Sequence, residues 1–238
     1  MKKGIQKREA IRRMVMIAMF TAMAFVAMLV IHIKVSFLTL DVKDAVITLC
    51  GLCFGPLSAL TISVLVPLLE LITVSTTGAY GLIMNILGSV AFSVTASLIY
   101  KLKKNMWGAA TGLISGAVLM TAIMLLANLF ITPLFLKTPR EVVQEMIPTL
   151  LLPFNVLKSA VNVGLVLLLY KTVSRLLKKT GFLPKDARPV DNVAESDQTR
   201  ASGHITTVVV SVVAVVLIVL SFVLIFTVMG GKFDFGVN

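Results

Sequence analysis

A lysine and two asparagines lie inside an otherwise apolar stretch of the chain. The segment PFNVLKSAVN carries Asn155, Lys158 and Asn162, and the apolar run 163–170 follows it. A charge near the middle of a bilayer costs roughly 2.5–3.5 kcal/mol on insertion scales, so an ionisable residue there is a candidate functional group. Asn155 and Lys158 are three residues apart and therefore share one face of a helix. That face offers an amide, which donates and accepts, and an ammonium with three donors.

A purely structural reading of the same residues stays open. Lys158 can extend its ammonium to the bilayer surface, and the asparagines can bond a neighbouring helix. Glu70 is the only acid within an apolar segment. Together with Tyr80 and Asn85 it can face a cavity open to the outside, or it can simply lie near the membrane interface.

The composition indicates an integral membrane protein. The 238 residues are 58% hydrophobic and only 14% charged, which is too apolar for a soluble domain. The net charge of +11 does not indicate nucleic-acid binding, because the basic residues cluster at the edges of apolar segments, as the positive-inside rule describes. We therefore predict a multi-pass protein of the cell membrane with a cytoplasmic N-terminus.

The predicted fold is an all-α membrane bundle of six helices with one further helix after it. The six spans, all within domain 1–179, are expected at about 14–33, 45–56, 58–73, 81–100, 107–131 and 150–170. A polar linker at 180–205, a seventh apolar helix at 206–229 and a tail at 230–238 are expected to follow. Outside loops are expected at 34–44, 75–81 and 132–144.

The apolar run 45–73 is predicted to form two short helices. Gly55-Pro56 interrupts it, and proline disfavours helix at the residue before it. Counting two spans here also keeps the basic segment 101–104 on the same side as the N-terminus. Each short helix falls below the roughly 20 residues that a full crossing needs, so both are expected to be shielded by neighbours.

Two sets of small residues predict close approach between helices. Gly108, Gly112 and Gly116 form one such face. Ala18 and Ala22 form another in the first span, and they serve either internal packing or the docking of a partner helix.

Several kinds of chemistry find no support in the sequence. Cys50 and Cys53 form a C-x-x-C, but the pair lies in an apolar segment with no further cysteine, so we predict two small buried residues. No phosphate-binding loop, zinc-protease motif or nucleophile elbow occurs. We expect no catalytic residue, no metal site and no cofactor. A protein that binds a small molecule from outside, with the energy for any transport supplied by something other than this chain, fits best.

Several stretches resemble the substrate-binding S components of energy-coupling-factor (ECF) vitamin transporters. The loop and span FLTLDVKDAVITLCGLCFGPLSAL resembles the family's apolar loop with an aspartate, followed by a span that closes in F-G-P. The resemblance covers about residues 10–179. It implies that Ala18 and Ala22 dock on a transmembrane coupling subunit, which two cytoplasmic ATPase subunits drive.

Within that family, PFNVLKSAVN looks most like the sixth helix of the riboflavin-specific members. The resemblance implies that Asn128, Asn155 and Lys158 hydrogen-bond the flavin ring, whose pyrimidine edge has carbonyl and ring-nitrogen acceptors and one N–H donor. The resemblance implies, more weakly, a lid and a wall for the binding site, formed by Leu38, Thr39, Leu40, Asp41, Tyr80 and Gly81. Asn85, one turn into the fourth span, is a further candidate for substrate binding.

Two other hypotheses remain open at this point. The first keeps the family and changes the ligand to pantothenate, folate or thiamine. The second is a structural or regulatory membrane protein that binds no solute, in which Lys158 pairs with Glu70 inside the bundle.

Overall fold

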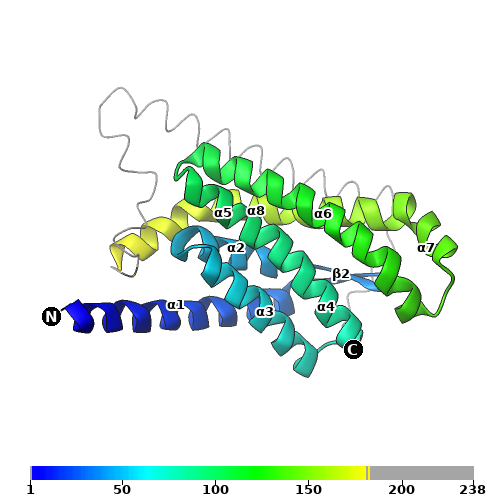
Figure 1. The fold of residues 1–238 in the computed structure, drawn as a ribbon, viewed down its shortest axis with the longest axis horizontal. Helices are drawn as coiled ribbons and strands as arrows, with labels where there is room; N and C mark the ends of the chain where they lie inside the picture. The colour runs from blue at the N-terminus through cyan, green and yellow to red at the C-terminus, as the bar shows by residue number, and fades with distance from the viewer. Residues whose placement is uncertain (1, 181, 183–238) are drawn as a thin grey trace.

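The computed structural model describes residues 2–180 and 182, which form a helical bundle with one small hairpin (Figure 1). The predicted seventh helix at 206–229 and the tail at 230–238 lie outside the described residues, as does the linker at 180–205 apart from residues 180 and 182. In chain order the elements are α1 (Lys2–Val30), β1 (His32–Val35), β2 (Leu38–Asp41), α2 (Lys43–Phe54), α3 (Pro56–Thr73), α4 (Gly78–Ser89), the π-helical η1 (Val90–Val94), α5 (Thr95–Leu102), α6 (Met106–Leu136), α7 (Arg140–Met146), the π-helical η2 (Ile147–Leu151) and α8 (Leu152–Lys179).

Five helical stretches among the described residues are long and apolar enough to cross a membrane. They are Glu9–Val30, Pro56–Thr73, Gly78–Leu102, Met106–Leu136 and Arg140–Leu177. With the shorter α2 they give the six helices predicted for the bundle. In Figure 1, α2 lies in the middle of the bundle, between α1 and α3 on one side and α6 and α8 on the other.

The predicted break between two short helices is confirmed. α2 ends at Phe54, α3 begins at Pro56, and Gly55 between them has a φ of 94°, a conformation that glycine adopts without steric cost. Eleven of the 12 residues of α2 are buried, so neighbouring helices do shield it. The same expectation is wrong for α3, which has 18 residues and exposes Leu57, Leu65 and Ile72.

The described chain is mostly helical, as predicted, but the first loop contains a pair of strands that was not predicted. β1 and β2 form an antiparallel hairpin in which His32 lies opposite Asp41 and Val35 opposite Leu38. The stretch 32–41 alternates bulky and polar residues, and Ser36 turns the chain with a positive φ of 57°. The hairpin therefore brings Thr39 and Asp41 into a defined register instead of leaving them in an irregular loop.

The predicted outside loop at 132–144 is mostly helical. α6 continues to Leu136 in spite of Pro133, and α7 begins at Arg140. From Arg140 the chain is helical through η2 to Lys179, so Lys158 lies near the middle of the spanning stretch Arg140–Leu177. Similarly, α4 already begins at Gly78, which places Tyr80 in a helix.

The glycine face of α6 packs closely on α5 and η1, as predicted. A Cβ atom at Gly112 would lie 2.7 Å from the carbonyl oxygen of Ala96, and one at Gly116 would lie 2.6 Å from that of Phe92. Both neighbours are backbone atoms, which cannot swing aside as a side chain can. The backbones of α6 and its neighbours approach this closely only because no side chain separates them.

We expect Gly112→Ala and Gly116→Ala each to lower thermal stability. A helix gains up to about 1 kcal/mol when alanine replaces glycine, but overpacking against a backbone costs typically about 1–3 kcal/mol, so the net effect should be a loss. Thermal unfolding of the purified protein in mild detergent measures it.

Gly88→Ala is the matched control, because the nearest neighbours of its new Cβ would be two flexible side chains, Met124 at 3.3 Å and Met120 at 3.7 Å. This variant should unfold at or above the wild-type temperature. Equal stability of all three variants would contradict the packing assigned to α6.

Candidate functional site

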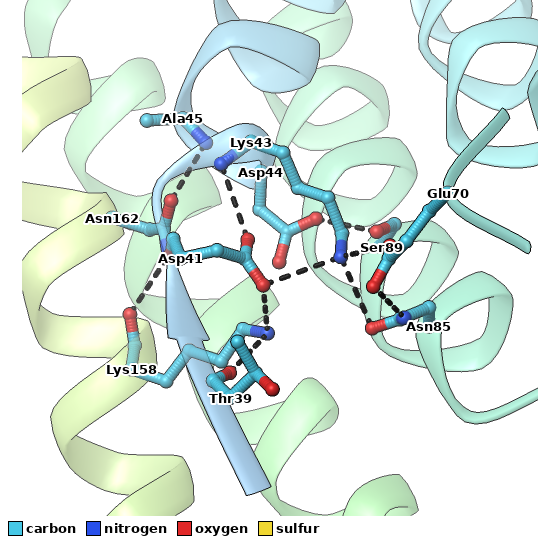
Figure 2. Close-up of polar contacts among 10 residues, drawn as sticks. All are labelled: Thr39, Asp41, Lys43, Asp44, Ala45, Glu70, Asn85, Ser89, Lys158 and Asn162. Carbon is cyan, nitrogen blue, oxygen red and sulfur yellow. Dashed lines mark hydrogen bonds and ion pairs between the residues drawn. The ribbon is translucent and has the colours of Figure 1, made fainter. Parts of the chain in front are cut away.

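The hairpin covers the beginning of α8. Side chains of β1, β2 and the residue after them pack on the first three turns of α8 in a separate apolar cluster, formed by Val35, Leu40, Val42, Phe154, Leu157 and Val161. Beside this cluster lies a buried network of charged and polar groups (Figure 2).

The carboxylate of Asp41 lies at the centre of this network. Its Oδ2 atom accepts hydrogen bonds from the ammonium groups of Lys158, at 2.9 Å, and Lys43, at 3.2 Å. Its Oδ1 atom accepts from the backbone N–H of Lys43 at 3.2 Å. Burial by itself would raise the pKa of Asp41, but the two ammonium groups reverse this, and the pKa lies well below its ordinary value. Asp41 is therefore a carboxylate that two lysines share.

Lys43 uses all three of its ammonium donors. Besides Asp41, it donates to Glu70 Oε2 at 2.9 Å and to Asn85 Oδ1 at 3.1 Å. Asn85 in turn donates to the other oxygen of Glu70 at 3.0 Å. Lys43 thus joins the hairpin to α3 and α4, and its side chain is only 1% exposed.

Lys158 has two acceptors among the described residues. It donates to Asp41 and, at 3.3 Å, to the backbone carbonyl of Thr39. The residue is 7% exposed, so Lys158 is buried and does not extend to the bilayer surface. The pairing of Lys158 with Glu70 is wrong, because Glu70 forms its ion pair with Lys43.

Asn162 ties three elements together. Its amide donates to the backbone carbonyls of Asp41, at 3.3 Å, and Lys158, at 2.9 Å, and its oxygen accepts from the N–H of Ala45 at 2.8 Å. Asn162 is completely buried. Asn162 thus supplies, from α8, a second acceptor for the Ala45 N–H in the first turn of α2, which also donates to the backbone carbonyl of Val42 at 3.2 Å. The expectation that an asparagine bonds a neighbouring helix is confirmed for Asn162.

Asn155 and Asn128 bond mainly within their own helices. Asn155 donates to Leu151 O at 2.7 Å, and its buried Oδ1 has no hydrogen-bond partner within the described part of the chain. Asn128 donates to Met124 O and accepts from Thr132, both at 2.7 Å. No hydrogen bond joins Asn128, Asn155 and Lys158 to one another in residues 2–180, although α6 packs against α8.

The residues predicted as lid and wall have different surroundings. All four hairpin residues lie in β2, where Leu40 and Asp41 are buried while Leu38 and Thr39 are half-buried. Asn85 belongs to the ion network. Tyr80 is exposed, and its ring packs on Phe135 of α6 with 6.0 Å between centroids. Gly81, one residue later, is half-buried.

Sequence reasoning missed Lys43, which the prediction placed in an outside loop. It also missed Asp44, which accepts from Ser89, and the nearby hydroxyl pair Thr48 and Ser93. The available signal was the run DVKD, residues 41–44, at the start of the otherwise mostly apolar helix α2. Alternating acids and a base at that place favour an internal ion network over a solvated loop.

Ala18 and Ala22 both lie on the outer face of α1. They are exposed, whereas Met16, Phe20 and Ala24 of the same helix are buried. Internal packing within the described bundle is therefore excluded as the role of this pair. Cys50 and Cys53 are free and buried, as predicted. The described residues hold no cluster of His, Cys, Asp and Glu that could bind a metal ion.

The spanning helices and the buried polar network define a multi-pass helical membrane protein. More narrowly, the chain belongs to the family of ECF transporter substrate-specific components, whose family model matches residues 12–174. This family consists of transporter components and is not a class of enzymes.

Two known proteins resemble the chain over most of their own length. It is 29% identical over 177 residues to the riboflavin transporter RibU of Staphylococcus aureus (strain TCH60), a match that covers 71% of this chain and 93% of RibU. A solved structure described as "Structure and mechanism of the S component of a bacterial ECF transporter" matches with a TM-score of 0.61 and 28% identity, covering 70% of this chain and 97% of that one.

The ion network leads to a prediction about Lys43. Lys43→Met should lower the free energy of unfolding by about 3–5 kcal/mol, because removing one partner of a buried pair leaves an uncompensated charge. Here that charge is the carboxylate of Glu70. Denaturant or thermal unfolding in detergent measures the loss.

The double variant Lys43→Met, Glu70→Gln should recover part of the lost stability, since it leaves no unpaired carboxylate on α3. Lys101→Met, at an exposed position, is the control and should change stability by less than about 0.5 kcal/mol. A single Lys43→Met variant as stable as wild type would contradict the network.

Proposed function

We propose that this protein is the riboflavin-binding component of an ECF importer. The observation that carries the proposal is its similarity to a riboflavin transporter along nearly the whole length of that relative. The S-component structure supports it, because it aligns with this chain over 97% of its own length.

The arrangement on α8 supports a flavin ring as the ligand. Lys158 has one ammonium N–H without an assigned acceptor among the described residues, and the Asn155 carbonyl, about one helical turn away, has no donor. The pyrimidine edge of a flavin carries carbonyl acceptors beside one N–H donor. In our proposal Lys158 donates to a ring carbonyl and Asn155 accepts from the ring N–H. Asn128 completes the polar side, and apolar side chains cover the ring faces.

The remaining residues of the proposed site come from the hairpin and α4. Leu38, Thr39, Leu40 and Asp41 form the lid, and Tyr80, Gly81 and Asn85 form a wall. The ligand enters from the outer face, with the N-terminus in the cytoplasm. The support for this orientation is the distribution of basic residues, of which six precede the first span and three lie at 101–104.

The other vitamins considered fit the charges less well. Thiamine is cationic, and Glu70, the acid that would have to balance it, is already paired with Lys43. Pantothenate and folate are anionic, and the charge of Lys158 is already balanced by Asp41. Riboflavin is neutral in its ring and side chain.

Transport in our proposal requires further subunits. The protein docks on a transmembrane coupling subunit that two cytoplasmic ATPases drive. The exposed pair Ala18 and Ala22 on α1 supports this, because small residues on an outer helix face allow another helix to approach closely.

Riboflavin binding tests the proposal directly. Purified wild-type protein should quench riboflavin fluorescence in a saturable titration. Lys158→Ala should weaken binding about 10-fold to 150-fold, because a hydrogen bond from a charged group contributes about 1.5–3 kcal/mol. Asn155→Ala should weaken it about twofold to tenfold, in line with about 0.5–1.5 kcal/mol for a neutral hydrogen bond.

Lys101→Ala, at an exposed position far from Asn155 in the sequence, should bind riboflavin like wild type. Thermal unfolding of each variant shows whether the fold is kept. Unchanged affinity in both Lys158→Ala and Asn155→Ala would overturn the assigned site, and a folded wild type that binds no riboflavin would overturn the proposed ligand.

Docking is tested separately from binding. Ala18→Leu and Ala22→Leu should leave riboflavin affinity within about twofold of wild type, yet reduce uptake by cells at least about tenfold, because a bulky side chain keeps the partner helix away. Uptake of labelled riboflavin in cells that carry the whole transporter measures this effect.

The matched control is Ala79→Leu, which places the same bulk at an exposed alanine of α4. Its uptake should stay close to wild type. Normal uptake by both α1 variants would remove the docking role of this face.

A further inference from the structure

The two buried lysines of the network differ in how many of their ammonium N–H donors already have an acceptor. The three ammonium donors of Lys43 go to Asp41, Glu70 and Asn85, so Lys43 has none left for a ligand. Lys158 has two acceptors among the described residues and is the more exposed of the two side chains, at 9% against 1%. Only Lys158 can therefore offer a ligand a donor without first giving up one of these bonds.

Although Lys158 has a hydrogen-bond donor for a ligand, its positive charge is already neutralised by Asp41. Asp41 Oδ2 lies 2.9 Å from its ammonium nitrogen. Opposite charges at this distance attract each other strongly in a buried environment, so the pair presents little net charge to its surroundings. The nearby Asp44, whose carboxylate accepts from Ser89, adds no positive charge. Lys158 thus offers a hydrogen-bond donor with its charge already balanced.

We infer that Asp41 determines the charge specificity of the binding site, so that the site accepts a neutral acceptor edge and rejects an anionic one. The inference rests on the proposed function, since it requires Lys158 to touch the ligand. Asp41 acts through Lys158 and is a positioning and specificity residue; the ligand itself contacts Lys158.

Specificity of this kind comes from a difference between two affinities. A lysine without a counter-ion would attract an anion more strongly than a neutral carbonyl and would favour carboxylate or phosphate ligands. Asp41 removes that advantage, and the anion would in addition lie close to a fixed carboxylate. Like charges at short distance disfavour the charged form of a group, and the same argument applies to a charged ligand.

Riboflavin itself supplies a matched pair of ligands for the test. The oxidised ring is neutral. On taking up two electrons and one proton it becomes a reduced ring that is anionic in weakly alkaline buffer, with the charge shared between N1 and the neighbouring carbonyl of the pyrimidine edge. Both forms have nearly the same size, and they differ in charge at the edge assigned to Lys158.

The experiment compares the midpoint potential of bound and free riboflavin. Anaerobic reduction of the flavin complex, in equilibrium with a reference dye, gives the ratio of the two affinities. Wild type should bind the neutral oxidised form more tightly than the anionic reduced form. Asp41→Asn should shift the ratio at least tenfold towards the anion, which raises the potential of the bound flavin by about 30 mV for a two-electron couple.

Two further variants separate specificity from general damage to the network. Glu70→Gln removes a carboxylate of the same network that is paired with Lys43, and should shift the ratio less than about threefold. Asp41→Asn, Lys158→Gln removes both charges of the pair and should return the ratio to within about threefold of wild type. Three other charged or titratable groups near the pair are unchanged in all of these variants: His32, which lies opposite Asp41 in the hairpin, Lys43, which donates to Asp41, and the neighbouring Asp44.

The outcomes distinguish the inference from the proposed function. A wild type that binds no riboflavin in either form overturns both. A wild type that binds riboflavin but prefers the anionic form overturns the inference alone, and this result needs no variant, so it stands even where Asp41→Asn does not fold. An unchanged ratio in a folded Asp41→Asn variant, or an equal shift in Glu70→Gln, also overturns the inference.

Discussion

The described structure depends on one carboxylate that is shared between two ammonium groups. Asp41 lies at the end of the hairpin, and through Lys158 and Lys43 it connects β2 to α8 and, beyond Lys43, to α3 and α4. Buried charges are stable only when they are paired and hydrogen-bonded. The position of the hairpin and the orientation of both lysines therefore follow from the same requirement, which the apolar cluster beneath the hairpin reinforces.

Much of the helical framework could be predicted from the sequence, because the bilayer limits the alternatives. In lipid, apolar segments such as these must hydrogen-bond their own backbone groups, which a helix does. The boundary predicted at Gly55-Pro56 is also present in the structure. The end of α6 could not be predicted in this way. A proline usually ends or kinks a helix, yet α6 continues past Pro133 to Leu136. The hairpin was missed because its strands have four residues each, the shortest length at which an alternating pattern indicates a strand.

The sequence made it possible to predict which polar residues of the candidate site are unusual, but not which residues they contact. Lys158, Asn155 and Asn162 are recognisable because polar groups are rare inside spans. Their hydrogen-bond partners could not be predicted in the same way. Asp41 and Lys158 are 117 residues apart, and sequence spacing carries information only about neighbours on one helix. Lys43 was overlooked for the same reason, since its partners Glu70 and Asn85 belong to two other helices.

The long separation within the Asp41–Lys158 pair also imposes an order of assembly during synthesis. The chain emerges from the ribosome with its N-terminal part first. Glu70 and Asn85 follow Lys43 by only 27 and 42 residues, so their bonds can form while the later helices are still being made. Lys158 and Asn162 are the last of these partners to be made. The hairpin can be fixed in place only when α8 is inserted, so fixing it is a late step in the assembly of the described bundle.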